Sequence, residues 1–315
     1  MWLPTRLVDV GDTDSQRPRV VVTASEHIGD CEYLCLTHRW IDTTLKLEST
    51  NIDELSKEIP IEKISQTFRD AFETTRKLGF RYIWADSLCI MQDHQHEDGW
   101  QDWLTESARM GENYKHAALT IAPTPAVDNA DEFFSNRDMS QRTPFAVNIE
   151  RKAPEDTSWS RCNRTQVDAS GRYYCFSEDL WLSQVNRAPL NRRGWVYQER
   201  LLSPRTVHFA TEVFWECRTE NAKCWRGKMR TSKFLDEHGW WMTFVENFSH
   251  CHLTMGRDKL PAIAGVAALV ELPNDQYLAG LWRSGLASQL IWRRSEKRLA
   301  DYEPPANYRG RNCAR

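Results

Sequence analysis

Two short apolar runs on either side of one amphipathic helix constrain the fold of this chain most strongly. Residues 33–37 read YLCLT and residues 81–85 read RYIWA. Neither run alternates polar and apolar side chains in a regular way, which is typical of central strands covered on both faces. Between them, apolar side chains recur at helical spacing over residues 64–78, and Gly79 offers a stop. A strand, a helix and a second strand joined by tight links form a right-handed crossover, so the two strands are predicted to pair in parallel.

The alternation of helix and strand continues to about residue 125. Residues 98–116 place large side chains at steps of three and four, which predicts one buried face of a long helix. Residues 118–122, ALTIA, follow as a third strand before Pro123 and Pro125 interrupt the pattern. We therefore expect residues 1–125 to form an α/β core around three adjacent parallel strands.

The rest of the chain is less regular. Residues 126–170 are dominated by Asn, Asp, Arg and Pro, which predicts an irregular insertion. Residues 171–315 are predicted to form a C-terminal α+β part, with a strand at 172–176, a hairpin over 206–217 and helices from about residue 234 onward.

The charge balance argues against nucleic acid as the main partner. The chain holds 41 Lys and Arg against 44 Asp and Glu, a formal net charge of −3, with no block of like charges that would neutralise a run of phosphates. Its first residues lack the apolar segment of a signal peptide, and no stretch reaches the roughly 18 uninterrupted apolar residues of a membrane helix. We therefore expect a soluble, cytoplasmic protein with neither nucleic acid nor membrane as a partner.

Cysteine usage agrees with a cytoplasmic location. The nine cysteines are an odd number and are spread widely, which predicts free thiols rather than a disulfide framework. Cys217, Cys224 and Cys251, with His250 and His252, lack the C-x2-C pair that anchors a zinc site. No bound metal is expected.

Three blocks of sequence carry a resemblance to a known family. They are YLCLTHRW at 33–40, FRDAFETTRKLGFRYIWADSLCIMQD at 68–93 with W-x2-E-S-x2-M-x3-Y following at 103–114, and PLNRRGWVYQERLLSPRTVHF at 189–209. With DKLPAIAG at 258–265 and GLWRSGLASQLIWR at 280–293, the chain resembles a fungal heterokaryon-incompatibility (HET) domain protein over nearly its full length. Members of that family commonly continue past the last block into a Pro-Ser-Trp-rich strand segment. This chain ends in a different, basic sequence, so a truncated C-terminal part is expected.

The resemblance implies a function. HET domains act as effectors of programmed cell death in fungal non-self recognition, so we expect signalling through protein partners or self-association. The family has been compared with TIR domains, which have flavodoxin-like folds and in some lineages cleave NAD. The resemblance therefore implies a flavodoxin/TIR-like parallel sheet. It leaves two alternatives open, a nucleotide-processing enzyme that takes NAD as substrate and a small-molecule enzyme of fungal metabolism. No cofactor is expected.

The carboxyl ends of the predicted strands offer the first candidate site residues, because ligands bind at that edge of an open parallel sheet. The candidates that follow the first two strands are His38, Arg39, Trp40, Asp86, Cys89 and Gln92. A His, an Arg and an Asp from adjacent strands suit an anionic, hydrogen-bonding ligand such as a nucleotide. Two structural alternatives remain, namely that Asp86 serves a turn or a helix cap with Arg39 as its ion partner, and that Cys89 is a packed apolar thiol.

Glu106 is the leading candidate for catalysis, with Asp86 and His38 in the same cluster. It follows Trp103 by three positions and precedes Met110 by four, which places it at the margin of the buried helix face. A partly desolvated carboxylate there is suited to stabilising a cationic ribose. The alternative is a surface ion pair, for which Arg109 is at the right spacing.

The third block concentrates polar residues around a short helix predicted over 193–201. Gln198, Glu199 and Arg200 are the candidate binding residues. In one hypothesis Glu199 clamps Arg192 or Arg205 in a bidentate pair. In the other, Gln198 and Glu199 complete a cleft begun by His38 and Asp86, so that the three blocks meet in space. The sequence contains no G-x-G-x-x-G, P-loop, H-E-x-x-H or G-x-S-x-G pattern, and therefore no self-sufficient enzyme signature.

Overall fold

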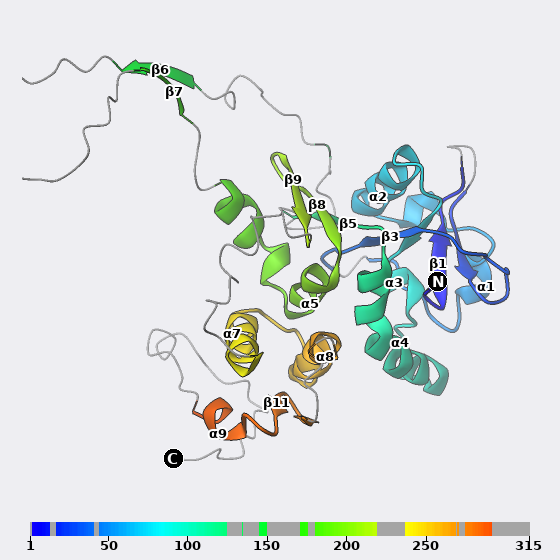
Figure 1. The fold of residues 1–315 in the computed structure, drawn as a ribbon. Coiled ribbons are helices and arrows are strands. Elements are labelled where there is room, and N and C mark those ends of the chain that lie inside the picture. The colour runs from blue at the N-terminus through cyan, green and yellow to red at the C-terminus, as the bar shows by residue number, and fades with distance from the viewer. Residues whose placement is uncertain are drawn as a thin grey trace, which may run out of the picture.

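A mixed sheet of seven strands forms the centre of the protein (Figure 1). The computed structural model describes residues 2–12, 17–40, 44–124, 134, 145–149, 171–175, 180–218, 237–268, 270 and 275–291. In spatial order the sheet runs β2 (Arg19–Val22), β1 (Arg6–Asp9), β4 (Tyr82–Trp84), β3 (Tyr33–Leu36), β5 (Leu119–Pro123), β8 (Arg205–Phe209) and β9 (Val213–Cys217).

The predicted parallel centre of the sheet is confirmed. On β3, Leu34 pairs in parallel with Ile83 of β4 on one side and with Leu119 of β5 on the other. All four residues of β3 are buried, as expected for an apolar run covered on both faces. The crossover helices are α2 (Gln66–Lys77) and α4 (Glu97–His116). Gly79 adopts a left-handed φ of 82° just beyond α2, which ends that helix where the sequence predicts.

Four further strands make the sheet mixed. The predicted hairpin over 206–217 is confirmed as β8 and β9, and β8 pairs in parallel with β5. The sheet therefore combines strands from both predicted parts of the chain. On the other side, β1 pairs antiparallel with β2 and with β4. These two strands are missing from the prediction. In β1, charged residues stand at both ends, Arg6 and Asp9, and leave an apolar stretch of only Leu7 and Val8.

The predicted insertion at 126–170 contains one regular element among its described residues. Strand β6 (Phe145–Ile149) pairs antiparallel with β7 (Gly171–Cys175) in a separate two-stranded sheet, so the predicted insertion includes one strand. The β7 strand agrees with the strand predicted at 172–176, and the remainder of the insertion lies outside the described residues except for Phe134.

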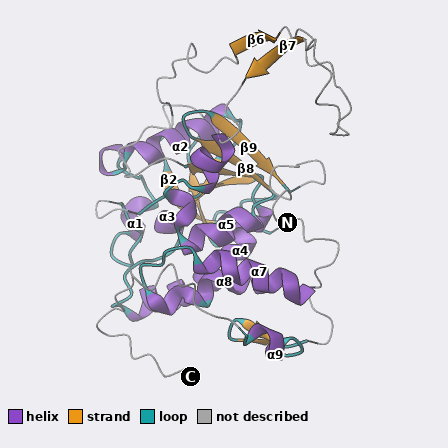
Figure 2. Ribbon diagram, turned by 90° about the vertical axis from the view of Figure 1, so that its left-hand side faces the viewer, coloured by secondary structure: helices purple, strands orange, loops and turns teal. Residues whose placement is uncertain are grey.

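Several helices pack together beside the sheet (Figure 2). They are α5 (Gly194–Leu202), α7 (Glu237–Ser249) and α8 (Pro261–Ala267), with α4 next to α5 and α8. Close approach of α4 to α8 depends on two glycines, because a Cβ on Gly265 would lie 3.2 Å from the Cα of Gly111.

The shorter elements connect these layers and complete the C-terminal part. They are α1 (Ile52–Leu55), η1 (Ile61–Lys63), α3 (Asp86–Cys89), η3 (Leu182–Asn186), η4 (Leu190–Arg192), η5 (Gly256–Lys259), α9 (Leu286–Gln289) and the hairpin of β10 (Tyr277–Leu278) and β11 (Leu281–Trp282). Within the described ranges, no helix combines the length and the apolar character that crossing a bilayer requires.

Candidate functional site

A cleft of about 990 Å³ opens where β3 and β4 end. Its walls come from four stretches of chain: the residues after β3, the region from α3 to α4, the segment 187–199, and the loop 252–258. The lining includes His38, Arg39, Trp40, Asp86, Gln92, Trp103, Arg192, Arg193, Trp195, Glu199 and Arg257. All three blocks that carry the family resemblance therefore contribute to one cleft, and the prediction that they meet in space is confirmed.

Asp86 organises the polar group at the strand ends. Its Oδ2 accepts a hydrogen bond from Nε1 of Trp40 at 2.9 Å, and its Oδ1 accepts one from the backbone N–H of Ser87 at 2.8 Å. The second bond means that Asp86 also serves the turn into α3, as the structural alternative proposed. Oδ1 lies 3.5 Å from Nδ1 of His38. Asp86 thus orders the start of α3 and the indole of Trp40 while it faces the cleft.

His38 is a buried imidazole that lines the cleft. Its side chain is 1% exposed, and neither ring nitrogen has a hydrogen-bond partner among the described residues. Burial lowers the pKa of His38, with Arg193 acting in the same direction and Asp86 opposing it. A neutral imidazole that lines the cleft carries one donor and one acceptor, and it is therefore suited to binding a hydrogen-bonding ligand.

Glu199 is the second carboxyl group of the cleft. It is buried on α5, and its Oε2 lies 2.9 Å from the hydroxyl of Tyr114 on α4. Burial is the largest cause that raises the pKa of Glu199 to about 7, and the charge of Asp86 adds to it. The group therefore titrates near neutral pH, which is unusual for a carboxyl group and typical of functional clefts.

The cleft carries an excess of positive charge. Its lining includes six Lys and Arg (residues 39, 46, 187, 192, 193 and 257) against three carboxyl groups (residues 86, 199 and 258). Arg187 and Arg192 are exposed and have no carboxylate partner among the described residues. Three indoles, those of Trp40, Trp103 and Trp195, add flat apolar surface. Guanidinium groups beside aromatic rings suit an anionic ligand that contains a planar group.

Arg193 joins the third block to the first. Its Nη1 donates a hydrogen bond of 2.8 Å to the backbone carbonyl of His38. The adjoining backbone of the third block is also tied to the loop 252–258, because Gly194 N–H donates to His252 O at 2.8 Å and His252 N–H donates to Arg192 O at 2.7 Å. These hydrogen bonds connect the segment 187–199 both to the residues after β3 and to the loop 252–258.

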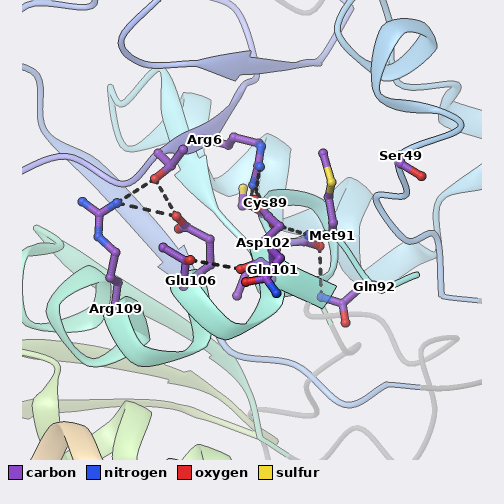
Figure 3. Close-up of polar contacts among 12 residues, drawn as sticks. Arg6, Ser49, Cys89, Met91, Gln92, Gln101, Asp102, Glu106 and Arg109 are labelled. Atoms are coloured by element: carbon purple, nitrogen blue, oxygen red, sulfur yellow. Dashed lines mark hydrogen bonds and ion pairs between the residues drawn. The ribbon is translucent and has the colours of Figure 1, made fainter. Parts of the chain in front are cut away.

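Four predicted site residues do not line the cleft, namely Glu106, Cys89, Gln198 and Arg200. Glu106 is buried on α4 and accepts a 2.7 Å hydrogen bond from the Thr5 hydroxyl (Figure 3). It also lies 3.6 Å from Arg109, so the ion pair that the sequence left as an alternative is present. The expectation that Glu106 shares a site with His38 and Asp86 is wrong, because Trp103, Ser107 and Met110 are the α4 residues that line the cleft.

Cys89 is packed in the core with none of its surface exposed, and it does not line the cleft. Burial raises the pKa of its thiol to about 12, with Arg6 acting in the opposite direction. Arg6 donates to the backbone carbonyl of Cys89 at 2.8 Å and forms an ion pair with Asp102 (Figure 3). The expectation of a ligand-binding Cys89 is therefore wrong, and the structural alternative of a packed thiol describes it.

The remaining residues of the third block have separate partners. Gln198 points toward α8, where its Oε1 accepts the backbone N–H of Gly265 at 3.0 Å. Arg200 forms a two-bond pair with Glu216 of β9, at 2.7 and 3.2 Å. The bidentate pair in this block is thus Arg200 with Glu216, and not Glu199 with Arg192 or Arg205. Neither Gln198 nor Arg200 lines the cleft. Gln92 does line it, with its amide donating to the backbone carbonyl of Ile90 at 3.0 Å.

Sequence reasoning missed the wall of the cleft contributed by residues 252–258 and the cations Lys46 and Arg187. Apart from Asp258, which begins the block at 258–265, these positions lie outside the blocks that carry the family resemblance, and only tertiary packing brings them to the cleft. The sequence predicted Tyr114 only as part of a buried helix face. Nothing in the neighbouring sequence indicates that its hydroxyl contacts Glu199, which lies 85 positions away. Among the described residues, no cluster of His, Cys, Asp and Glu is arranged to hold a metal ion.

Comparison with known proteins identifies the family to which the cleft-lining blocks belong. No curated protein and no solved structure matches the chain. A family model described as "Heterokaryon incompatibility protein (HET)" matches residues 33–199, which is more than half of the chain and extends from the start of β3 to Glu199 in the cleft. The chain therefore belongs to the heterokaryon-incompatibility (HET) family.

Proposed function

We propose that this protein is an effector of fungal non-self recognition that acts in the cytoplasm and promotes programmed cell death. In this proposal a ligand in the cleft controls its association with protein partners or with further copies of itself. One observation supports the proposal: the first and third blocks typical of the family are separated by more than 100 residues, yet residues of all three blocks line the same cleft. Local packing alone does not require residues far apart in the sequence to lie together, whereas a ligand-binding cleft does.

The chemistry of the cleft favours an anionic ligand with a planar group, such as a nucleotide. Arg192 and Arg193 are placed to bind phosphate oxygens, and the indoles of Trp40 and Trp195 offer surfaces for a base. His38 and Asp86 are suited to sugar hydroxyls, because one is a neutral imidazole and the other an acceptor. A flavodoxin/TIR-like fold is part of the proposal. The parallel order of β4, β3 and β5, with α2 and α4 in the crossovers, supports it.

Inducible expression in a fungal host tests the effector function. We expect wild-type protein to kill the host and Arg192→Glu to abolish killing at equal protein level, because the substitution reverses a charge at the cleft. Arg69→Glu is the matched control, since Arg69 is an exposed arginine on α2 that does not line the cleft. Equal killing by both variants, or survival with wild-type protein, would contradict the proposal.

A second candidate is a nucleotide-processing enzyme that cleaves NAD. The observation that favours it is the pair of carboxyl groups, Asp86 and Glu199, inside an indole-lined cleft. A carboxylate placed beside the nicotinamide–ribose bond would stabilise the cationic ribose as that bond breaks. Because Glu106 lies elsewhere, Asp86 takes the role that the sequence assigned to Glu106.

Nicotinamide release by purified protein tests the second candidate. We expect Asp86→Asn to abolish release while Asp98→Asn, at an exposed position on α4, leaves it unchanged. Cell death without loss of cellular NAD would eliminate the enzyme and leave signalling by assembly.

A further inference from the structure

The buried hydroxyl group of Tyr114, next to the cleft residue Glu199, faces two acceptors. The Tyr114 oxygen lies 2.9 Å from Oε2 of Glu199 and 3.2 Å from the backbone carbonyl of Leu36. A tyrosine hydroxyl carries a single proton, so it donates fully to only one of them. If Glu199 is a carboxylate, Tyr114 donates either to it or to Leu36 and not fully to both. If Glu199 is a neutral acid, its own O–H donates to Tyr114, and Tyr114 donates to Leu36.

The environment of Glu199 also favours the neutral acid. The residue is 4% exposed and forms no ion pair with any Lys or Arg in the described ranges. The charged and titratable groups around it are Asp86 from α3, Cys35 from β3, Tyr114 from α4, and Arg193 at the start of α5. Burial and Asp86 raise the pKa of Glu199, while the hydroxyl of Thr37, Arg193 and Tyr114 act in the opposite direction. Asp86 repels a second negative charge, and the Arg193 guanidinium is already bound to the carbonyl of His38. A buried carboxylate without a cation is costly, so the acid keeps its proton.

We propose that Glu199 is the proton-carrying group of the cleft. It is a neutral acid while the cleft is empty, linked through Tyr114 to the carbonyl of Leu36, and it exchanges its proton according to the charge of the bound ligand. The first part depends only on the geometry of these residues. The second part rests on the proposed function, since it assumes that the cleft binds an anion. An anion close to Glu199 holds the proton in place, so anion binding should weaken as pH rises and Glu199 ionises.

Carbon-13 NMR of protein labelled at the glutamate carboxyl carbon tests the first part without any ligand. The Glu199 resonance is identified by its loss in Glu199→Gln, or by its shift in Glu199→Asp if the first variant does not fold. We expect its titration midpoint near neutral pH, well above the ordinary value of 4.5 for a glutamate side chain. A midpoint in the range of exposed glutamates would overturn the proposal.

Sulfate binding, followed by calorimetry, tests the second part, because sulfate itself does not titrate near neutral pH. We expect the affinity of wild-type protein to fall by up to about tenfold per pH unit above the Glu199 midpoint, the limit for one linked proton. In Glu199→Gln the part of this fall that Glu199 causes should be absent, because glutamine is neutral at every pH and can also donate to Tyr114.

The imidazoles of His38 and His94 also line the cleft, and burial lowers the pKa of each, so the pH dependence left in Glu199→Gln measures the share of groups other than Glu199. An unchanged pH dependence in Glu199→Gln would overturn the link to ligand charge. If no sulfate binds at any pH, the anion-binding function and this second part fail together, while the NMR midpoint still decides the resting state of Glu199.

Discussion

The Arg193 guanidinium donates a 2.8 Å hydrogen bond to the backbone carbonyl of His38 across 155 positions of the chain. This bond connects the start of α5 to the residues that follow the central strand β3. It places a positive charge beside the imidazole of His38 and the carboxylate of Asp86, and so it shapes the cleft as well as the fold.

Arg193→Ala should therefore affect both stability and binding. The His38 carbonyl loses a charged donor, so we expect the free energy of unfolding to fall by about 1–3 kcal/mol. Sulfate binding should weaken at the same time. Arg192→Ala is the matched control, because that exposed side chain has no carboxylate partner among the described residues and should lower binding with little change in stability. Urea unfolding and calorimetry measure the two effects, and equal stability loss in both variants would contradict the structural role.

Glu106→Gln should leave the function of the cleft intact. Glutamine still accepts the hydrogen bond of Thr5, and only the 3.6 Å ion pair with the partly exposed Arg109 is lost. We expect a stability loss of about 0.5–1.5 kcal/mol and unchanged killing in the expression assay. Complete loss of killing by a folded Glu106→Gln protein would return Glu106 to the list of catalytic candidates.

Glu199 should make the protein less stable as pH rises from about 4.5 to about 7. Its pKa is raised to about 7 in the folded protein from an ordinary value of 4.5, so in this window the folded state holds a proton that the unfolded state has lost. The stabilising contribution of Glu199 is therefore complete below pH 4.5. Between pH 4.5 and about 7, the free energy of unfolding decreases by at most about 1.4 kcal/mol per pH unit. Urea unfolding at several pH values measures the slope, and Glu199→Gln should flatten it. Parallel pH profiles for both proteins would show that Glu199 titrates normally.

Gly265→Ala should destabilise the packing of α8 on α5 and α4. The added Cβ would lie 2.9 Å from Oε1 of Gln198, whose position is held by the backbone N–H of Gly265. Although alanine favours helices, we expect a net loss of about 1–3 kcal/mol from overpacking. Gly256→Ala is the control, since a Cβ there meets no atom within 4 Å, and its effect should stay within about 0.5 kcal/mol. A thermal unfolding midpoint that is equal for both variants would argue against this close approach.

Cys89 should be unreactive in the folded protein. Its thiol has no exposed surface and its pKa is raised to about 12, so little thiolate forms and reagents do not reach it. Alkylation with iodoacetamide, followed by peptide mass spectrometry, should modify the partly exposed Cys31 first and Cys89 only after unfolding. Modification of Cys89 at the rate of Cys31 in native protein would contradict the packed position.

The sequence by itself determined the centre of the fold. Strands β3, β4 and β5 and helices α2 and α4 follow from apolar runs and helical spacing, because these patterns report which faces of a segment are buried. The same reasoning located His38, Arg39 and Asp86 at the carboxyl edge of the sheet, where parallel strands deliver their following residues. The resemblance of residues 189–209 to the family added the expectation that this segment would lie close to His38 and Asp86.

Only the tertiary structure decided which polar side chains share the cleft. Glu106 and Ser107 are neighbours on α4, yet one contacts Thr5 and the other lines the cleft, since adjacent helix positions point about 100° apart. The pairing of Glu199 with Tyr114, in place of Arg192 or Arg205, depends on how α5 packs against α4. Strand β1 also needed long-range partners, because its buried Arg6 is compensated by Asp102 on α4. Such contacts join residues far apart in the chain, and local periodicity carries no information about them.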